Sequence, residues 1–167
     1  MSHPVELFGY PVLGRLGDGA ASTIYRIRNP QSGEEHALKH VVKRGEKDQR
    51  FIDQLVDEQR IGARLSHTSI RRIGKLLRKR RKFRVAEVGL IMEYVDAPGL
   101  DTMQGKTLLE NIRIFTRIAE GLHSMHQAGI VHTDIKPTNV LVDDSVVKII
   151  DLGQACPIGT TKGRIQG

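Results

Sequence analysis

The run His132-Thr133-Asp134-Ile135-Lys136-Pro137-Thr138-Asn139 is followed, after a predicted hairpin, by Asp151-Leu152-Gly153, and these two motifs indicate the fold. They offer an aspartate that can accept or orient a hydroxyl proton and a lysine that can neutralise phosphate. They also offer an asparagine and a second aspartate that can hold a metal ion, and phosphoryl transfer needs all of these groups. A polar loop that only connects a helix to a hairpin does not require these four residue types in this order. The two motifs therefore predict a phosphoryl-transfer site.

A long helix is predicted immediately before this stretch. The run Thr107-Leu-Leu-Glu110 has the capping-box arrangement, in which the glutamate reaches back to the cap, and Gly129 is placed to end the helix. We expect residues 107–126 to form a buried helix, followed by the two short strands NVLVD (139–143) and VVKIID (146–151). The apolar positions at three- and four-residue steps are Leu108, Ile112, Phe115, Ala119 and Leu122.

Strands and one helix are predicted in the first half of the chain. The runs YPVLGRL (10–16), STIYRIR (22–28) and EHALKHVV (35–42) are separated by turn residues and predict three antiparallel strands. Between residues 48 and 65 the spacing becomes helical, with Phe51, Leu55, Gly62 and Leu65 on one face. The run VAEVGLIMEYV (85–95) predicts a buried strand, and the loop DAPG (96–99) predicts a hinge between two lobes.

Lys39 and Glu58 are each the odd polar residue in an apolar element. Lys39 lies in the middle of the third predicted strand, where a lysine is ordinarily on the solvent side, and Glu58 falls on the apolar face of the predicted helix. A carboxylate within an apolar stripe is costly unless a cation meets it. The two residues together predict one ion pair.

A glycine-rich turn lies between the first two of these strands, in the run Leu16-Gly-Asp-Gly-Ala-Ala-Ser-Thr-Ile24. Glycines allow backbone N–H groups to approach phosphate oxygens closely. Turns of this kind also join many ordinary hairpins, so the turn alone leaves both readings open. A strand follows the turn, whereas a dinucleotide-binding fold needs a helix there, which disfavours a Rossmann site.

With these motifs the chain resembles the protein kinase family from about Tyr10 to Gly167, and the run FGYPVLGRLGDGA is similar to the opening of bacterial kinases of the eukaryotic type. The resemblance implies that Asp134 is the catalytic base and that Lys136 contacts phosphate. It implies ATP and Mg²⁺ as cofactors, with Asn139 and Asp151 as the magnesium ligands.

Further roles in nucleotide binding follow from the same resemblance. Lys39 would contact the α- and β-phosphates and pair with Glu58, and Met92 matches the gatekeeper. Glu93 and Val95 fall where backbone groups of the hinge hydrogen-bond adenine. The implied cofactor-binding residues are Leu16, Gly17, Asp18, Gly19, Ala20, Ala21, Ser22, Ile24, Ala37, Lys39, Met92, Glu93, Val95 and Leu141.

The resemblance implies an α+β, protein-kinase-like fold. Residues 1–94 would form the N-terminal lobe, with a five-stranded antiparallel sheet and one helix. Residues 95–167 would form the hinge and a partial, mainly helical C-terminal lobe. No Ala-Pro-Glu motif follows the start of the activation segment, so we expect a truncated domain whose predicted helix at 107–126 exposes an apolar face.

Three positions depart from the pattern of the family. Ser22 replaces the third glycine of the turn, and Leu152 replaces the usual phenylalanine; both changes are mild. Thr133 stands where most members have an arginine that reads a phosphate on the activation segment. Control by that phosphate is therefore in doubt.

Composition bounds the remaining possibilities. The 167 residues carry a net charge of +7, much of it in the run from Lys75 to Arg84, which we interpret as a solvated hairpin turn, with nucleic-acid binding as a secondary hypothesis. There is neither a signal-peptide pattern nor a membrane span, and Cys156 is the single cysteine, which favours a cytoplasmic protein. We expect a serine/threonine protein kinase that acts on an unknown protein. The alternative is a catalytically inactive nucleotide-binding or interaction module, with self-association through the exposed helical face.

Overall fold

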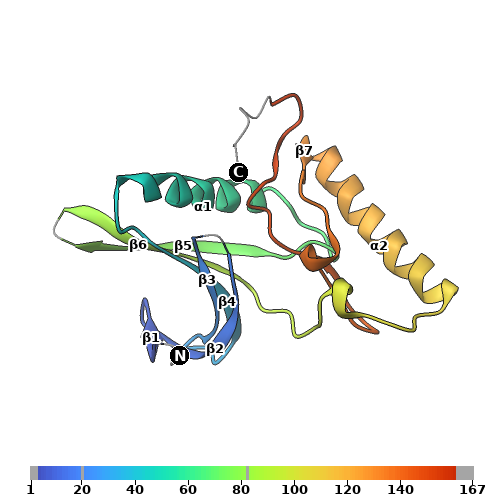
Figure 1. Cartoon of the computed structure of the whole chain (residues 1–167), viewed down its shortest axis with the longest axis horizontal. Coiled ribbons are helices and arrows are strands. Elements are labelled where there is room, and N and C mark those ends of the chain that lie inside the picture. The colour runs from blue at the N-terminus through green and yellow to red at the C-terminus, as the bar shows by residue number, and fades with distance from the viewer. Residues whose placement is uncertain (1–3, 20, 82, 161–167) are drawn as a thin grey trace. The chain divides into compact units, whose positions relative to one another are not determined.

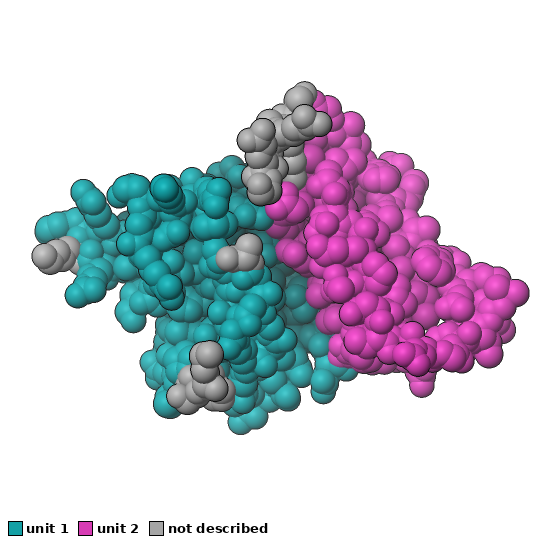
Figure 2. Space-filling view, in the orientation of Figure 1, with its two compact units in different colours: residues 1–63, 71–96 teal, residues 64–70, 97–167 magenta. Residues whose placement is uncertain are grey.

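The computed structural model describes residues 4–19, 21–81 and 83–160 (Figure 1). The chain divides into two compact units, drawn in different colours in Figure 2. Unit 1 contains residues 1–63 and 71–96, and unit 2 contains residues 64–70 and 97–167. Each unit has its own hydrophobic core, and the lobe boundary at residues 94 and 95 stays a prediction. Among the described residues, no helix is long and apolar enough to cross a lipid bilayer.

Unit 1 is built on a six-stranded antiparallel sheet. The sequence predicts five strands, and the two-residue strand β1 adds a sixth at one edge. The spatial order is β1-β2-β3-β4-β6-β5, so β5 forms the other edge. The strands are β1 (Glu6–Leu7), β2 (Tyr10–Asp18), β3 (Thr23–Arg28), β4 (Glu35–Val42), β5 (Ile73–Arg81) and β6 (Arg84–Glu93).

Helix α1 (Gln49–Gly62) follows the short 3₁₀ helix η1 (Glu46–Asp48) and packs on β5 and β6. Ile52 and Leu55 bury their side chains among those of β4 and β6. Gly62 allows this close packing, because a Cβ atom there would lie 2.3 Å from Cγ1 of Ile73. The opposite face of the sheet has a second apolar cluster, which contains Leu38.

The basic run from Lys75 to Arg84 is not a hairpin turn, and this part of the sequence-based interpretation is wrong. Residues 75–81 belong to strand β5, and only residues 82 and 83 lie between β5 and β6. The reason is that Leu76 packs into the cluster beneath α1 while Leu77 packs into the cluster on the other face. This alternation is typical of a strand with both faces covered. Lys82 lies outside the described residues.

Unit 2 is organised around helix α2 (Leu108–Gln127). The predicted capping box is present: the backbone N–H of Thr107 donates to Oε2 of Glu110 at 2.7 Å, and the N–H of Glu110 donates to Oγ1 of Thr107 at 3.3 Å. The chain leaves the helix through Gly129, whose φ is 73°. The other elements are η2 (Leu100–Thr102), β7 (Ile130–Val131), η3 (Pro137–Asn139), β8 (Val140–Val142), β9 (Val147–Ile149) and β10 (Cys156–Pro157).

The buried face of α2 differs from the predicted one. Ile114, Ile118, Gly121 and Met125 are buried, and Ile114 and Ile118 belong to one core cluster with residues of β8 and β9. The stripe predicted from the sequence is instead exposed, except for the partly buried Leu122. Both stripes are apolar at helical spacing, so periodicity alone does not select the face that the hairpin of β8 and β9 covers. The large apolar residues exposed on α2 are Leu108, Leu109, Ile112 and Phe115.

Candidate active site

The glycine-rich turn joins β2 to β3, so a strand follows it as predicted. Gly17 pairs with Ile24 and Asp18 with Thr23 at the end of the hairpin. The turn is closed by a hydrogen bond from the N–H of Gly19 to the carbonyl of Ser22, at 2.8 Å. A Cβ atom on Gly17 would meet nothing within 4 Å, so packing within the protein does not require glycine there. Ala20 lies outside the described residues.

Asp18 is engaged within this turn. The Arg15 guanidinium forms an ion pair with its carboxylate, and the Thr23 hydroxyl donates to Oδ1 at 3.2 Å. The hydrogen bond from Arg15 lowers the pKa of Asp18 below its ordinary value, with a further contribution from Thr23. The turn therefore ends in an ionised, exposed carboxylate that is already paired.

Lys39 and Glu58 form the predicted ion pair, with 2.8 Å between Nζ and Oε2. Lys39 lies in β4 between Ile24 of β3 and Leu90 of β6. Glu58 lies on α1 one turn after the buried Leu55 and is 1% exposed. The pair thus ties the helix to the middle of the sheet, and the Lys39 side chain is 15% exposed.

The residues implied for adenine binding lie where β4 meets β6. Ala37 and Met92 are cross-strand partners and both are buried. The N–H of Glu93 donates to the carbonyl of Arg72 at 2.9 Å, and its carboxylate accepts from the N–H of Arg72 at 3.0 Å. Val95 follows the end of β6 and is half-buried. These contacts fix the backbone at the end of β6.

Asp134, Lys136 and Asn139 come together in unit 2. The Lys136 ammonium lies 2.9 Å from Oδ2 of Asp134, and this contact raises the pKa of Lys136. The Asn139 amide donates from Nδ2 to the backbone carbonyl of Asp134 at 2.9 Å and to its Oδ2 at 3.1 Å. Asn139 is buried, so the Asp134 carboxylate is held between a buried amide and an exposed ammonium group.

His132 is buried and accepts a hydrogen bond from the backbone of the loop that carries Asp134. It is 2% exposed, and the N–H of Asp134 donates to its Nδ1 at 3.3 Å. Burial lowers the pKa of the imidazole, in spite of an opposing contribution from the Ile150 backbone. A neutral imidazole that accepts at Nδ1 carries its proton on Nε2. The ring therefore orients the Asp134 backbone without adding a charge.

Thr133 has a contact that the sequence did not indicate. Its φ is 65°, in the left-handed region that β-branched residues avoid, and its hydroxyl donates to the carbonyl of Gln154 at 2.7 Å. Strands β7 and β10 pair alongside, with Cys156 opposite Val131. Thr133 thus attaches the segment after Asp151 to the loop that carries Asp134. Nothing in the residue type alone points to this partner.

Asn139 and Asp151 lie at the ends of two paired strands. Val140 pairs with Ile149, and the N–H of Ile150 donates to the carbonyl of Asn139 at 2.9 Å. Asp151 has a φ of 60°, and its Oδ1 accepts from the N–H of Gly153 at 3.3 Å. Leu141, the third predicted residue on this hairpin, is half-buried and bridges to Gly99.

This pair of residues fits magnesium. The Asn139 amide donates through Nδ2, so its oxygen remains the acceptor, and an amide oxygen with a carboxylate is the kind of donor set that Mg²⁺ accepts. The part of the chain that the structure describes has no cluster of three or more His, Cys, Asp or Glu residues suited to a metal. Magnesium needs no such cluster, because it usually keeps several waters and takes phosphate oxygens as ligands.

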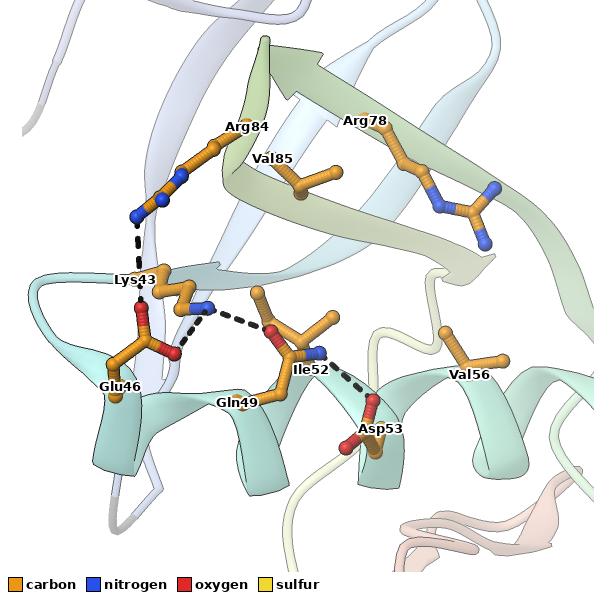
Figure 3. Close-up of a pocket in the computed structure, with 9 residues that line it drawn as sticks. All are labelled: Lys43, Glu46, Gln49, Ile52, Asp53, Val56, Arg78, Arg84 and Val85. Carbon is orange, nitrogen blue, oxygen red and sulfur yellow. Dashed lines mark hydrogen bonds and ion pairs between the residues drawn. The ribbon is translucent and has the colours of Figure 1, made fainter. Parts of the chain in front are cut away.

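One hollow in unit 1 is lined by none of the residues implied for catalysis or nucleotide binding, although Arg78 and Arg84 of the basic run line it. It lies between α1 and the hairpin of β5 and β6 and has a volume of about 530 Å³ (Figure 3). Three separate segments line it, so no single sequence motif indicates it. Its lining residues are Lys43, Glu46, Gln49, Ile52, Asp53, Val56, Arg78, Arg84 and Val85.

Comparison with known proteins agrees with this geometry. Residues 10–164 match the family model of the protein kinase domain. The chain is 34% identical over 140 residues to mitogen-activated protein kinase kinase 7 of Arabidopsis thaliana, which covers 83% of the chain and 44% of that protein. It is 29% identical over 161 residues to the serine/threonine-protein kinase PknJ of Mycobacterium tuberculosis, which covers 92% of the chain and 26% of that protein.

A third relative is the serine/threonine-protein kinase AfsK of Streptomyces coelicolor, with 31% identity over 163 residues, 95% of the chain and 20% of that protein. The chain thus spans less than half the length of these relatives. The α+β fold, with the antiparallel sheet and helix α1 in unit 1, is as the resemblance implies. The chain belongs to the protein kinase family and resembles its serine/threonine members.

Proposed function

We propose that this protein transfers the γ-phosphoryl group of Mg-ATP to serine or threonine hydroxyls of a protein substrate. The observation that carries the proposal is the arrangement around Asp134, whose carboxylate is held by Lys136 and Asn139 on a loop fixed by the neutral His132. Phosphoryl transfer requires little covalent chemistry from the protein, so positioning and charge stabilisation do most of the catalysis.

In unit 2, Asp134 accepts the proton of the substrate hydroxyl as the hydroxyl attacks phosphorus. The Lys136 ammonium group lies 2.9 Å from the Asp134 carboxylate and would neutralise charge on the transferred phosphoryl group. Asn139 and Asp151 would hold magnesium, which neutralises the phosphate oxygens when bound. The hydrogen bond from Gly153 to Asp151 supports this role, since it orients the carboxylate.

In unit 1, Lys39 contacts the α- and β-phosphates and Glu58 orients its ammonium group. The short ion pair and the burial of Glu58 support this assignment. The glycine-rich turn covers the phosphates, and the open space above Gly17 is compatible with that role. Ala37, Met92 and the backbone at the end of β6 contact the adenine. The proposal implies a cytoplasmic location, where ATP is available.

A second candidate function is a catalytically inactive interaction module derived from a kinase. The observation that favours it is the exposed apolar face of α2, where Leu108 is 78% and Phe115 61% exposed. Such a face suits self-association or a partner protein. The two candidates differ in one respect: a kinase needs the Asp134 carboxylate for its activity, whereas an interaction module does not.

The test is phosphate transfer from γ-labelled ATP to a mixture of serine- and threonine-containing proteins, compared between the native sequence and Asp134→Asn. We expect Asp134→Asn to lose about 100-fold or more of the activity while it keeps its affinity for ATP, because the removed carboxylate acts on the hydroxyl and not on the nucleotide. Asp144→Asn is the matched control, since Asp144 is an exposed side chain on a turn.

Equal transfer by the native sequence and Asp134→Asn would contradict the proposed chemistry. Nucleotide binding without any transfer by the native sequence would favour the interaction module instead. Phosphoamino-acid analysis of the labelled product identifies the acceptor, and label confined to tyrosine would contradict the serine/threonine assignment.

A further inference from the structure

The hairpin of β5 and β6 extends beyond the hydrophobic core of unit 1. Its pairing runs from Ile73 opposite Met92 to Arg81 opposite Arg84. Core contacts end near Leu76 and Leu77 on β5 and reach Val85 on β6, and the end of the hairpin projects past the start of α1 (Figure 1). We call its exposed end the hairpin tip. The hairpin tip consists of Arg78, Lys79, Arg80, Arg81, Phe83 and Arg84.

The hairpin tip carries more positive charge than the fold neutralises. Lys79 lies 3.5 Å from Glu87, and Arg84 lies 3.8 Å from Glu46, an exposed carboxylate that also contacts Lys43. Figure 3 shows Arg84 reaching Glu46, whereas Arg78 makes no such contact. In the described part of the chain, no carboxylate pairs with Arg78, Arg80 or Arg81.

Two of these positive charges repel each other across the end of the hairpin. Arg81 and Arg84 are direct cross-strand partners at the end of the ladder. Like charges directly opposite one another destabilise an antiparallel pair. Arg84 is offset only by the exposed Glu46 at 3.8 Å, and a local conflict that the fold compensates weakly is expected at functional positions. An anion outside the chain would remove the conflict.

Phe83 adds an apolar group at the same place. It lies between the two strands and is 99% exposed, the highest value among the exposed large hydrophobic residues. No apolar neighbour covers it within the described residues, although burial of a phenylalanine side chain is strongly favourable. The hairpin tip thus combines clustered cations with one aromatic side chain at a projecting end.

We propose that the hairpin tip binds the surface of an anionic lipid membrane, with the arginines at the headgroups and Phe83 inserted at the boundary of the acyl chains. This surface satisfies both features together, because it offers many anions in a plane and an apolar layer just beneath them. Each exposed arginine near such a surface strengthens binding about fivefold. The proposal does not depend on phosphoryl transfer.

Nucleic acid is the competing ligand, and the shape of the tip disfavours it. Proteins that bind single strands combine a basic groove with several aromatic platforms. The hairpin tip is a projecting end with a single aromatic residue, and the hollow beneath Arg78 and Arg84 is lined by the carboxylates of Glu46 and Asp53. A planar anionic surface needs neither a groove nor further aromatic residues.

The first experiment is flotation of the full chain with vesicles of phosphatidylcholine alone or with about one third phosphatidylserine. We expect binding only to the anionic vesicles, and loss of binding in about 0.5 M salt. The double variant Arg80→Gln/Arg81→Gln should bind about 25-fold more weakly. The matched control Arg113→Gln/Arg117→Gln removes the same charge from exposed positions on α2 and should change binding less than about twofold.

The second experiment uses Phe83→Trp, because the chain contains no tryptophan and the new residue reports alone. Its emission should shift to shorter wavelength with anionic vesicles and not with neutral ones. Absence of vesicle binding, or equal binding by Arg80→Gln/Arg81→Gln and the control, would overturn the proposal. Tighter binding to an oligonucleotide than to the anionic vesicles in the same buffer would overturn it in favour of nucleic acid.

Discussion

Replacement of Lys39 by methionine should destabilise the chain by about 3 kcal/mol. The substitution removes the ammonium group that lies 2.8 Å from Oε2 of Glu58 and leaves a carboxylate whose side chain is fully buried. Loss of one partner from a buried ion pair costs about 3–5 kcal/mol, and we take the lower end because the Lys39 side chain is 15% exposed. In a chain of this size the loss corresponds to a fall of about 6–12 °C in Tm.

The assay is urea unfolding followed by circular dichroism. Lys39→Met/Glu58→Leu should recover most of the lost stability, because replacement of both members of a buried pair by apolar residues is often neutral or better. Lys43→Met is the matched control: its partner Glu46 is 84% exposed at 3.6 Å, and the change should cost less than about 1 kcal/mol. The double variant should nevertheless fail in phosphoryl transfer, since it lacks the ammonium group that we propose contacts phosphate.

Two results would refute this reasoning. Unfolding of Lys39→Met at the same urea concentration as the native chain would mean that Glu58 is not desolvated as the structure has it. Equal stability of the double variant and Lys39→Met would mean that the buried Glu58 carboxylate is not the cause of the loss.

Three further predictions concern unit 2. Thr133→Val should lose about 1 kcal/mol and speed amide hydrogen exchange around Gln154, because it removes the hydroxyl donor; Thr133→Ser should keep both near native values. Burial lowers the pKa of His132, and likewise that of His40 in unit 1. Below about pH 6.5 the unfolded chain therefore binds more protons than the folded chain. Stability is therefore complete above about pH 6.5 and falls below it, and urea unfolding that shows greater stability at about pH 5.5 than at about pH 7.5 would contradict this sign. Phe115→Asp should reduce concentration-dependent association in sedimentation without lowering Tm, because Phe115 is 61% exposed; unchanged association would remove the α2 face from consideration.

The ion pair and the helix cap were predictable from the sequence, because each rests on residue types that have one physical explanation at their positions. Glu58 within an apolar stripe demanded a cation, and Lys39 within an apolar strand was the available partner; the ion pair is present. The capping box of Thr107 and Glu110 is a local pattern, and local patterns fix local hydrogen bonds. The roles assigned to Asp134 and to the other site residues stay predictions.

Other features depend on contacts between distant segments and were not predictable. Helix α2 has two apolar stripes, and only its packing on β8 and β9 selects the one that contains Ile118. The basic run forms a strand because Leu76 and Leu77 find apolar clusters on opposite faces of a sheet whose other strands come from elsewhere in the chain. Thr133 meets Gln154 only because β7 pairs with β10.

Calorimetric titration of ATP with and without magnesium tests the proposed metal site directly. We predict that magnesium strengthens ATP binding to the native chain and to Asp144→Asn, and that Asp151→Asn loses this strengthening while it keeps the magnesium-independent part. The same magnesium dependence in Asp151→Asn as in the native chain, or absence of ATP binding altogether, would contradict the proposed function.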